Sequence, residues 1–153
     1  MKLTRKSEYG LKGLLYLARQ KERRAVLTSE VSAAQDIPQS FLNKIFQKLV
    51  KAGILKSYRG YRGGFSLAKK PKEITLKKIV EILEGPIDLW PKKRNVESDE
   101  IEVAKGSSSA ALLSVWQKVQ LKVNRMLEKV TVLDLMKKSS KLEKSNDFFD
   151  QDN

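Results

Sequence analysis

Cysteine and histidine are both absent from this 153-residue chain, and their absence narrows the chemistry that it can perform. Without a thiolate or an imidazole, the chain has no disulfide, no nucleophilic cysteine and none of the usual ligands of zinc or iron–sulfur clusters. The remaining carboxylates, hydroxyls and lysines form no Gly-rich phosphate loop and no recognisable pair of acids. We therefore expect a protein that is not an enzyme and that holds no metal or other cofactor.

Amide, hydroxyl and cationic side chains that could contact nucleic acid are spaced along one face of a predicted helix over residues 39–51. That face carries Ser40, Asn43, Lys44, Gln47, Lys48 and Lys51, and an apolar stripe of Phe41, Leu42, Ile45, Phe46, Leu49 and Val50 occupies the other. A short helix is predicted over 28–35. Pro38 separates it from the helix over 39–51, because proline cannot continue the first helix but is tolerated at the start of the second. This order is typical of a helix-turn-helix, whose second helix enters the major groove of DNA.

The segment that follows has the pattern of a β-hairpin, or wing. Residues 54–59 alternate like a strand, the glycine-rich residues 60–64 predict a turn, and a second strand begins at Phe65. The tip carries Arg59, Tyr61 and Arg62 without an acidic residue, which suits contact with phosphates or a narrow minor groove. An ordinary hairpin with a solvated basic tip is the alternative.

The charge is concentrated in the same half of the chain. Residues 1–70 hold 16 of the 31 Lys and Arg residues but only 4 of the 18 Asp and Glu residues. A polyanion is the simplest partner, because each phosphate that is neutralised releases condensed counterions. A surplus of charge that only aids solubility is the alternative.

Other elements are predicted around this unit. A first helix begins after the cap residue Thr4, and another covers residues 75–84 before Gly85 and Pro86 end it. From about Ser109, apolar residues recur at steps of four and three, which indicates a heptad-like seam suited to dimerisation. The seam is Leu112, Trp116, Val119, Val123, Met126 and Val130. A helix that packs only on its own domain is the alternative.

These patterns predict a mostly α fold with a small β-hairpin wing. We assign a winged helix-turn-helix DNA-binding domain to residues 1–85, a loop to 86–108, a long dimerisation helix to 109–136 and a disordered tail to 137–153. Apolar runs are far too short to span a bilayer, and the N-terminus lacks the apolar region of a secretory signal. We expect a cytoplasmic protein with no membrane partner.

As a whole, the pattern resembles the Rrf family of winged helix-turn-helix transcription regulators, of the IscR and CymR type. The resemblance lies in residues 1–4 with Tyr9 and Gly10, 37–44 (Ile-Pro-Gln-Ser-Phe-Leu-Asn-Lys), 53–57, 59–65 (Arg-Gly-Tyr-Arg-Gly-Gly-Phe) and 82–86. It implies that Gln39, Ser40, Asn43 and Lys44 face the major groove, that Arg59 enters the minor groove and that Tyr9 contacts the DNA backbone. The full predicted DNA-binding set is Tyr9, Gln39, Ser40, Phe41, Asn43, Lys44, Arg59, Gly60, Tyr61 and Arg62.

The resemblance also implies a sensor-type loop before the long helix, where cluster-binding relatives hold a [2Fe-2S] cluster through cysteines. Counted back from Trp116, two of those cysteine positions correspond here to Ala104 and Ala110. Either the two alanines stand at these positions by chance, or they have replaced cysteines. Under both explanations we expect no cluster in this chain.

The leading hypothesis is a homodimeric, sequence-specific regulator, a repressor, that binds a pseudo-palindromic operator in double-stranded DNA. Its signal could be a lost cluster, a small ligand or a regulatory partner protein that acts on the loop. Two alternatives remain open, a non-specific nucleoid-associated protein and a module that binds other proteins.

Overall fold

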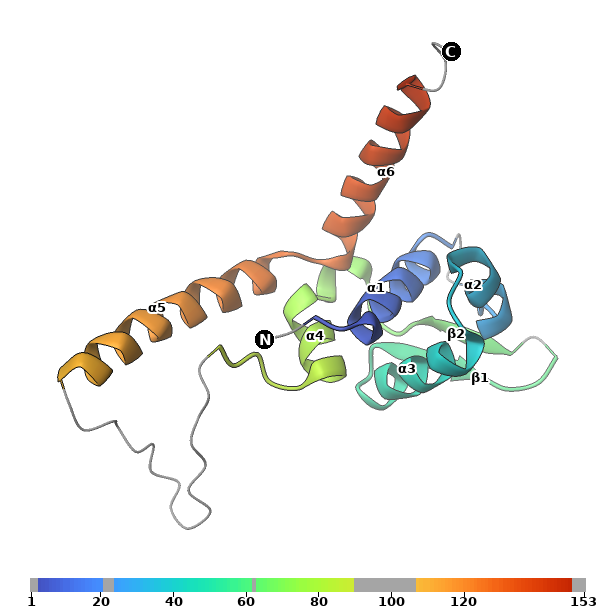
Figure 1. The fold of residues 1–153 in the computed structure, drawn as a ribbon. Helices are drawn as coiled ribbons and strands as arrows, with labels where there is room; N and C mark the ends of the chain where they lie inside the picture. The colour runs from blue at the N-terminus through green and yellow to red at the C-terminus, as the bar shows by residue number, and fades with distance from the viewer. Residues whose placement is uncertain (1–2, 21–23, 62, 90–106, 150–153) are drawn as a thin grey trace.

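The computed structural model describes residues 3–20, 24–61, 63–89 and 107–149, and it is mostly helical with one antiparallel hairpin, as the sequence predicts (Figure 1). Its α-helices in chain order are α1 (Arg5–Ala18), α2 (Thr28–Gln35), α3 (Gln39–Lys51), α4 (Leu76–Glu84), α5 (Ser107–Lys129) and α6 (Val132–Phe149). The hairpin strands are β1 (Leu55–Tyr58) and β2 (Gly64–Leu67), and a short 3-10 turn, η2 (Pro71–Glu73), precedes α4.

Helix α1 is the centre of the domain and contacts α2, α3, α4, α6 and β2. The side chain of Thr4 caps it by accepting a hydrogen bond from the backbone N–H of Lys6. Two glycines lie on its buried face, and a Cβ built at Gly13 would lie 2.8 Å from the ring of Phe46. Glycine therefore allows α3 to approach α1 more closely than any side chain would.

The core of the domain is formed by apolar side chains from all the elements that surround α1. Phe46 of α3 is fully buried and packs edge-on against Phe65 of β2, with ring centroids 5.1 Å apart. The largest fully buried side chains are Phe46, Leu14, Leu42, Ile45, Leu49, Ile54, Ile74, Ile79, Val26, Val31, Val80 and Val132. The predicted apolar stripe of α3 thus forms the centre of the core, apart from Phe41.

The wing is joined to the domain by more than its two strands. Leu55 pairs with Leu67 and Tyr58 with Gly64, and on the other side of β2 Phe65 exchanges backbone hydrogen bonds with Val26. Gly64 has φ +130°, and a Cβ there would lie 2.3 Å from the carbonyl oxygen of Val26. Only glycine fits at this close approach of two backbones.

The C-terminal part differs from the single helix expected over 109–136. Helix α5 ends at Lys129, so Val130, expected in the seam, lies after the helix, where its carbonyl accepts a hydrogen bond from Leu76 N–H. Residues 137–149, expected to be disordered, belong instead to α6. A capping box starts this helix, because Thr131 N–H donates to Asp134 and Asp134 N–H donates to the Thr131 hydroxyl.

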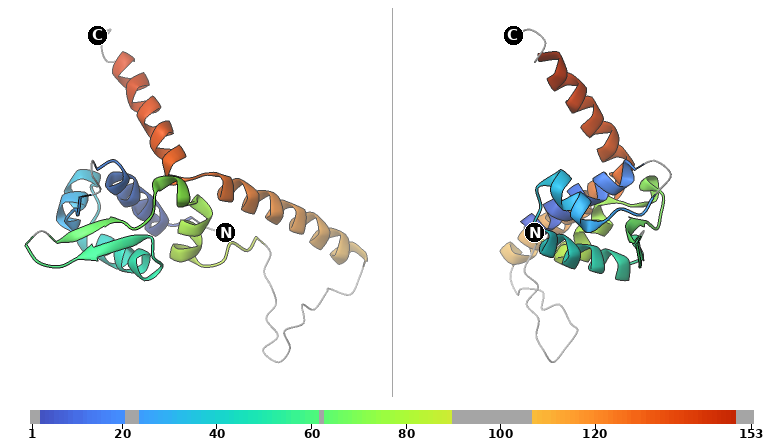
Figure 2. Two further views of the ribbon diagram at one scale, coloured as in Figure 1. Left: turned by 180° about the vertical axis from the view of Figure 1, so that it is seen from behind. Right: turned by 90° about the vertical axis from the view of Figure 1, so that its right-hand side faces the viewer.

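Helices α5 and α6 project from the domain in different directions (Figures 1 and 2). In both figures, α6 leaves on the side of the domain opposite to α3. Within the described part of the chain, no helix combines the length and the apolar character needed to cross a membrane.

Candidate DNA-binding surface

The outer face of α3 is a continuous polar and basic surface. Gln39, Ser40, Asn43 and Lys44 are all exposed in its first two turns. The helix starts directly after Pro38, and its buried residues hold the opposite face against α1 and α2. The four side chains expected in the major groove therefore share one solvent-facing surface.

Phe41 does not lie in the apolar stripe of α3 where the periodicity placed it. Its side chain is 52% exposed, and its ring meets Tyr9 of α1 edge-on at a centroid distance of 6.3 Å and an interplanar angle of 86°. The stripe expected from the sequence is wider than the face that α1 covers, which leaves Phe41 at the edge of the core. Two residues of the predicted DNA-binding set, Tyr9 and Phe41, are thus in direct contact.

The turn between α2 and α3 sets the angle of α3. Asp36 adopts the left-handed conformation, with φ 52° and ψ 51°, and the Ser32 hydroxyl donates a 2.6 Å hydrogen bond to the carbonyl of Ile37. The left-handed conformation is tolerated by aspartate better than by most residues, which makes Asp36 suited to end α2. The buried Ile37 then anchors the turn in the core.

The tip of the wing extends away from the domain into solvent. Arg59 and Gly60 are exposed, Gly60 has φ +94°, and Tyr61 is 100% exposed. The predicted contact Arg62 lies outside the described residues. Arg59 and Tyr61 therefore lie together on a projecting hairpin.

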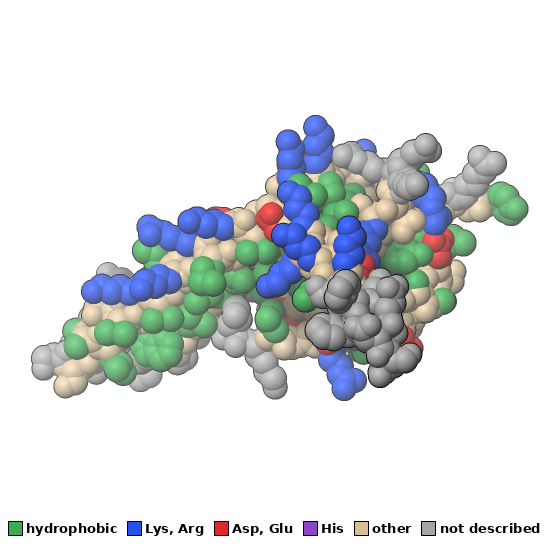
Figure 3. Space-filling model, turned by 90° about the horizontal axis from the view of Figure 1, so that it is seen from above, with side chains coloured by type: hydrophobic (Ala, Val, Ile, Leu, Met, Phe, Trp, Pro, Cys, Tyr) green, Lys and Arg blue, Asp and Glu red, His purple; other side chains and the backbone are tan. Residues whose placement is uncertain are grey.

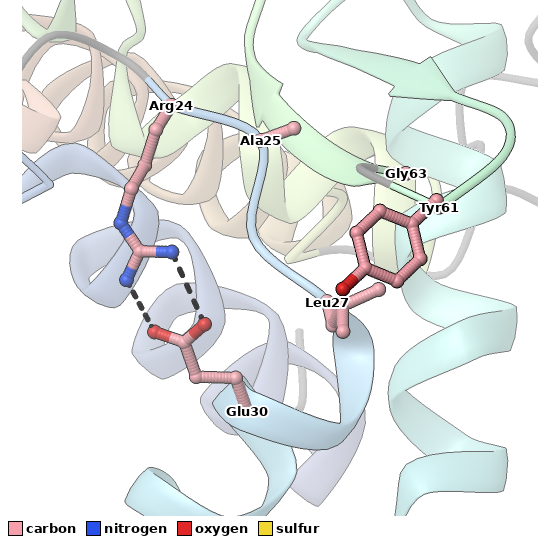
Figure 4. Close-up of a pocket in the computed structure, with 6 residues that line it drawn as sticks. All are labelled: Arg24, Ala25, Leu27, Glu30, Tyr61 and Gly63. Carbon is pink, nitrogen blue, oxygen red and sulfur yellow. Dashed lines mark hydrogen bonds and ion pairs between the residues drawn. The ribbon is translucent and has the colours of Figure 1, made fainter.

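Arg24 lies close to the wing, and its guanidinium forms an ion pair within the domain. It lines a surface pocket of about 400 Å³ with Ala25, Leu27, Glu30, Tyr61 and Gly63 (Figure 4). Its guanidinium binds both carboxylate oxygens of Glu30, with Nη1 3.2 Å from Oε2. The hydrogen bond from Arg24 lowers the pKa of Glu30, against the opposing effect of burial. Arg24 therefore ties the start of α2 to the preceding segment.

Glu84, the last residue of α4, holds the N-terminus of α1. Its Oε1 accepts hydrogen bonds from the Thr4 hydroxyl, the Thr4 N–H and, at 2.6 Å, the Ser7 hydroxyl; Lys6 Nζ lies 3.6 Å from Oε2. Burial alone would raise the pKa of Glu84, but the bonds from Ser7 and Thr4 and the charge of Lys6 outweigh it and bring the pKa to about 2.

The predicted dimerisation residues form an exposed apolar stripe on α5. Leu112, Trp116, Val119 and Met126 are exposed, by 53%, 37%, 37% and 70%, and Val123 is half-buried. Figure 3 shows hydrophobic side chains gathered along this helix with Lys and Arg side chains beside them. The strongest contacts of α5 with the domain are those with α4, and the stripe remains largely exposed.

The start of the predicted sensor-type loop is attached to α5 through Gln120. Its amide nitrogen donates to the carbonyl of Ile87, and its amide oxygen accepts a 2.7 Å hydrogen bond from Leu89 N–H. Sequence reasoning missed this residue; the amide pair Gln120 and Asn124, four residues apart and hydrogen-bonded beside the apolar seam, was the available signal. Ala104 lies outside the described residues, and Ala110 is exposed near the start of α5.

Comparison with known proteins agrees with this geometry. Residues 3–138 match the sequence profile of Rrf2, described as an iron-dependent transcriptional regulator family. The chain belongs to the Rrf2 family. The match confirms both the family resemblance that the sequence indicated and the winged helical fold. The family consists of transcription regulators, not enzymes.

Individual relatives cover most of this Rrf2 chain. A helix-turn-helix-type transcriptional regulator of Synechocystis is 36% identical over 88% of this chain and 87% of its own length. Among solved structures, CymR, the global cysteine regulator of B. subtilis, has a TM-score of 0.72 at 26% identity, covering 90% of this chain and 97% of its own. IscR of T. potens has a TM-score of 0.68 at 26% identity, covering 91% and 88%.

The residues of this Rrf2 chain do not fit an iron–sulfur cluster. Cluster irons are bound by thiolates or, at some sites, by imidazoles, and the sequence contains neither cysteine nor histidine. The described residues also hold no group of three or more acidic side chains placed to bind a metal ion. Iron dependence in the family description is therefore not carried by a cluster bound to this polypeptide.

Proposed function

We propose that this Rrf2 protein is a homodimeric repressor that binds a pseudo-palindromic operator, with α3 in the major groove and the wing against the flanking minor groove. The outer face of α3 carries the proposal, because Gln39, Ser40, Asn43 and Lys44 are exposed together at its N-terminal end. N-terminal residues of a recognition helix are those that reach base edges. Such a regulator acts in the cytoplasm, where bacterial DNA lies.

Charge supports the same orientation. Lys44, Lys48 and Lys51 are exposed along α3, and Lys56 and Arg59 are exposed on the wing. The acidic Glu8 near the start of α1 forms an ion pair with Lys12, which reduces its repulsion of phosphates. A basic surface built from α3 and the wing matches the charge of duplex DNA.

The dimer follows from the geometry of a two-fold operator and from α5. Two recognition helices must lie about 34 Å apart to occupy successive turns of the major groove. A second copy of α5 would cover the exposed stripe that includes Trp116 and Val119. It would thereby join the two DNA-binding domains of the dimer. We therefore assign dimerisation to the α5 stripe.

Selection from a pool of randomised duplexes tests specificity directly. We expect enrichment of a two-fold symmetric sequence, with affinity for it at least 10³ times that for a scrambled duplex at physiological salt. Equal affinity for both duplexes would identify a non-specific nucleoid-associated protein instead.

Arg59→Ala tests the role of the wing. Loss of an arginine from the minor groove should weaken operator binding by about 1–3 kcal/mol while the dimer remains intact. Lys138→Ala is a matched control, because it also removes one positive charge but lies on α6, on the side opposite to α3 (Figures 1 and 2). Fluorescence anisotropy titrations would measure both; an unchanged affinity of the Arg59 variant would refute the assignment.

For the signal, we propose a small ligand or a regulatory protein that acts on the loop after α4. The absence of thiolate and imidazole ligands argues against a cluster. Attachment of Ile87 and Leu89 to Gln120 supports this site, because an effector there would be linked to the proposed dimerisation helix. Hydrogen exchange of residues 87–89 in the presence of the effector would test it.

A further inference from the structure

Phe41 is a large apolar side chain on the surface that the proposed function assigns to the major groove. It occupies the first turn of α3, and its side chain is 52% exposed. Ser40 precedes it, and Lys44 lies beside it about one turn further along the helix; both are polar and exposed. About half of this side chain lies outside the core, so that part of its apolar surface is available to a ligand.

Tyr9 supports the Phe41 ring from behind. The two rings meet edge-on at 6.3 Å with an interplanar angle of 86°, a favourable aromatic geometry. Tyr9 is itself half-buried on α1, which is fixed at its N-terminus by the bonds of Thr4 and Ser7 to Glu84. The orientation of Phe41 is therefore set before any ligand arrives.

The chemistry of a phenyl ring restricts what it can recognise on DNA. The ring can neither donate nor accept a conventional hydrogen bond, so it does not read the donor and acceptor pattern of base edges. The apolar group that the four bases present in the major groove is the C5 methyl of thymine. Phenylalanine is among the side chains that contact this methyl group.

We propose that Phe41 determines specificity by packing against the C5 methyl of a thymine in each half-site of the operator. The inference rests on the proposed function and adds to it a base and an atom. It predicts that part of the operator affinity depends on a methyl group alone, without any change in base pairing.

The experiment uses the full-length protein and the duplex that it enriches from a randomised pool. Each thymine in turn is replaced by deoxyuridine, which lacks only the C5 methyl, symmetrically in both half-sites. For one thymine position, the wild-type protein should lose about fourfold in affinity per half-site, the effect of one buried methyl group. Phe41→Ala should bind the thymine and deoxyuridine duplexes equally.

Two further variants separate recognition from a structural role. Phe41→Leu keeps an apolar side chain and should retain most of the dependence on the methyl group. Lys138→Ala, on α6 and away from the proposed DNA-binding face, should retain all of it. Circular dichroism melting and sedimentation would verify that each variant is folded and has the oligomeric state of the wild type.

The outcomes are distinct. If Phe41→Ala loses affinity but keeps the wild-type sensitivity to deoxyuridine, Phe41 only positions Tyr9 and the inference is overturned. An enriched duplex in which no thymine methyl affects wild-type binding overturns it as well, while the proposed function stands. If no sequence is enriched, the proposed function itself fails and the inference fails with it.

Discussion

Glu84 connects two parts of the Rrf2 fold that are far apart in sequence. One carboxylate at the end of α4 accepts hydrogen bonds from Thr4 and Ser7 at the start of α1, and Ser7 is almost completely buried. Loss of this acceptor would leave the Ser7 hydroxyl buried without its partner, which is costly. The start of α1 carries Tyr9, which contacts Phe41, so the effect would extend to the proposed DNA-binding surface.

Stability should depend on the charge of Glu84. Because its folded-state pKa of about 2 lies below the ordinary value of 4.5, the carboxylate stabilises the fold above about pH 4.5, and that contribution is lost as the pH falls toward 2. Glu84→Gln should be less stable than the wild type by about 1–3 kcal/mol at pH 7, and the difference should narrow between pH 5 and 2. Urea unfolding at several pH values measures it.

Glu81→Gln, on the same helix, is the control for this titration and should change the free energy of unfolding less at pH 7. A difference between the wild type and Glu84→Gln that stays constant from pH 7 to pH 2 would contradict the role of the Glu84 charge.

Single residues show how far sequence patterns reach. Leu42, Ile45, Phe46 and Leu49 were predictable as core residues because their spacing follows the helical repeat, and all are buried. Phe41 fits the same repeat but is exposed, since the width of the buried face depends on how α1 crosses α3. The role of Gln120 could not be predicted from its spacing, because besides Asn124 its partners are backbone atoms on a distant segment.

At the scale of elements, the packing of α1 against α3 depends on a missing side chain. A Cβ at Gly13 would lie 2.8 Å and 3.0 Å from two atoms of the Phe46 ring, and that ring is itself fully buried. The ring cannot move aside without disturbing its contact with Phe65.

Gly13→Ala should therefore destabilise the protein although alanine favours helices. The gain in helix propensity is at most about 1 kcal/mol, whereas overpacking of a core costs about 1–3 kcal/mol. We expect a net loss of about 1 kcal/mol in the free energy of unfolding, measured by chemical denaturation. Lys12→Ala, exposed on the same helix, should change it by only a few tenths; a stabilised Gly13→Ala variant would refute the tight contact.

Helix α6 shows an element that composition concealed and a local motif could have revealed. Abundant Lys, Ser, Asp and Asn suggested disorder beyond residue 136, but Thr131 and Asp134 form a capping box that starts the helix. Arg19, the C-cap residue of α1, binds Ser139 and, at 2.9 Å, Glu143, which holds α6 beside the domain. The cap and the anchor stabilise a helix whose Leu, Met, Lys and Glu residues also favour it.

Asp134→Ala should loosen α6. Hydrogen bonds from the Thr131 hydroxyl and N–H lower the pKa of Asp134, so the cap is complete above the ordinary pKa of aspartate and weakens as the pH falls through the lowered value. We expect faster amide exchange over residues 132–140 in the variant at neutral pH. Lys138→Ala, within the same helix, should leave that exchange near wild type. Equal exchange in both variants would show that the cap does not control the helix.

At the scale of the whole molecule, the directions in which α5 and α6 leave the domain could not be predicted from the sequence. The heptad spacing predicted a long apolar helix, and α5 exists, but its direction is set by contacts with α4 and by the bonds of Gln120. The end of α5 at Lys129 also depends on a tertiary contact, because the carbonyl of Val130 accepts a hydrogen bond from Leu76 N–H.

Val119→Glu should disrupt the dimer. A charge placed in the α5 stripe would have to be buried without a partner between two helices. Sedimentation equilibrium should show a dimer for the wild type and a monomer for the variant at micromolar concentration. Operator binding should weaken by at least 100-fold, because only one half-site can be held at a time.

Gln117→Glu introduces the same charge two residues earlier on the exposed surface of α5, outside the predicted seam. It should remain a dimer with near wild-type affinity for the operator. A dimeric Val119→Glu protein would place the interface elsewhere.

The bonds of Gln120 also fix the point on α5 from which the chain continues beyond Leu89. The chain leaves this attachment at Leu89 and rejoins the same helix at Ser107. Those points on α5 are separated by about 20 Å of helix, whereas the roughly 17 intervening residues could extend to ~60 Å. A chain of this length is longer than the span between those two points, so shortening or lengthening it by several residues would not displace α5. Changes in the length of residues 90–106 are therefore compatible with one position of α5 relative to the domain.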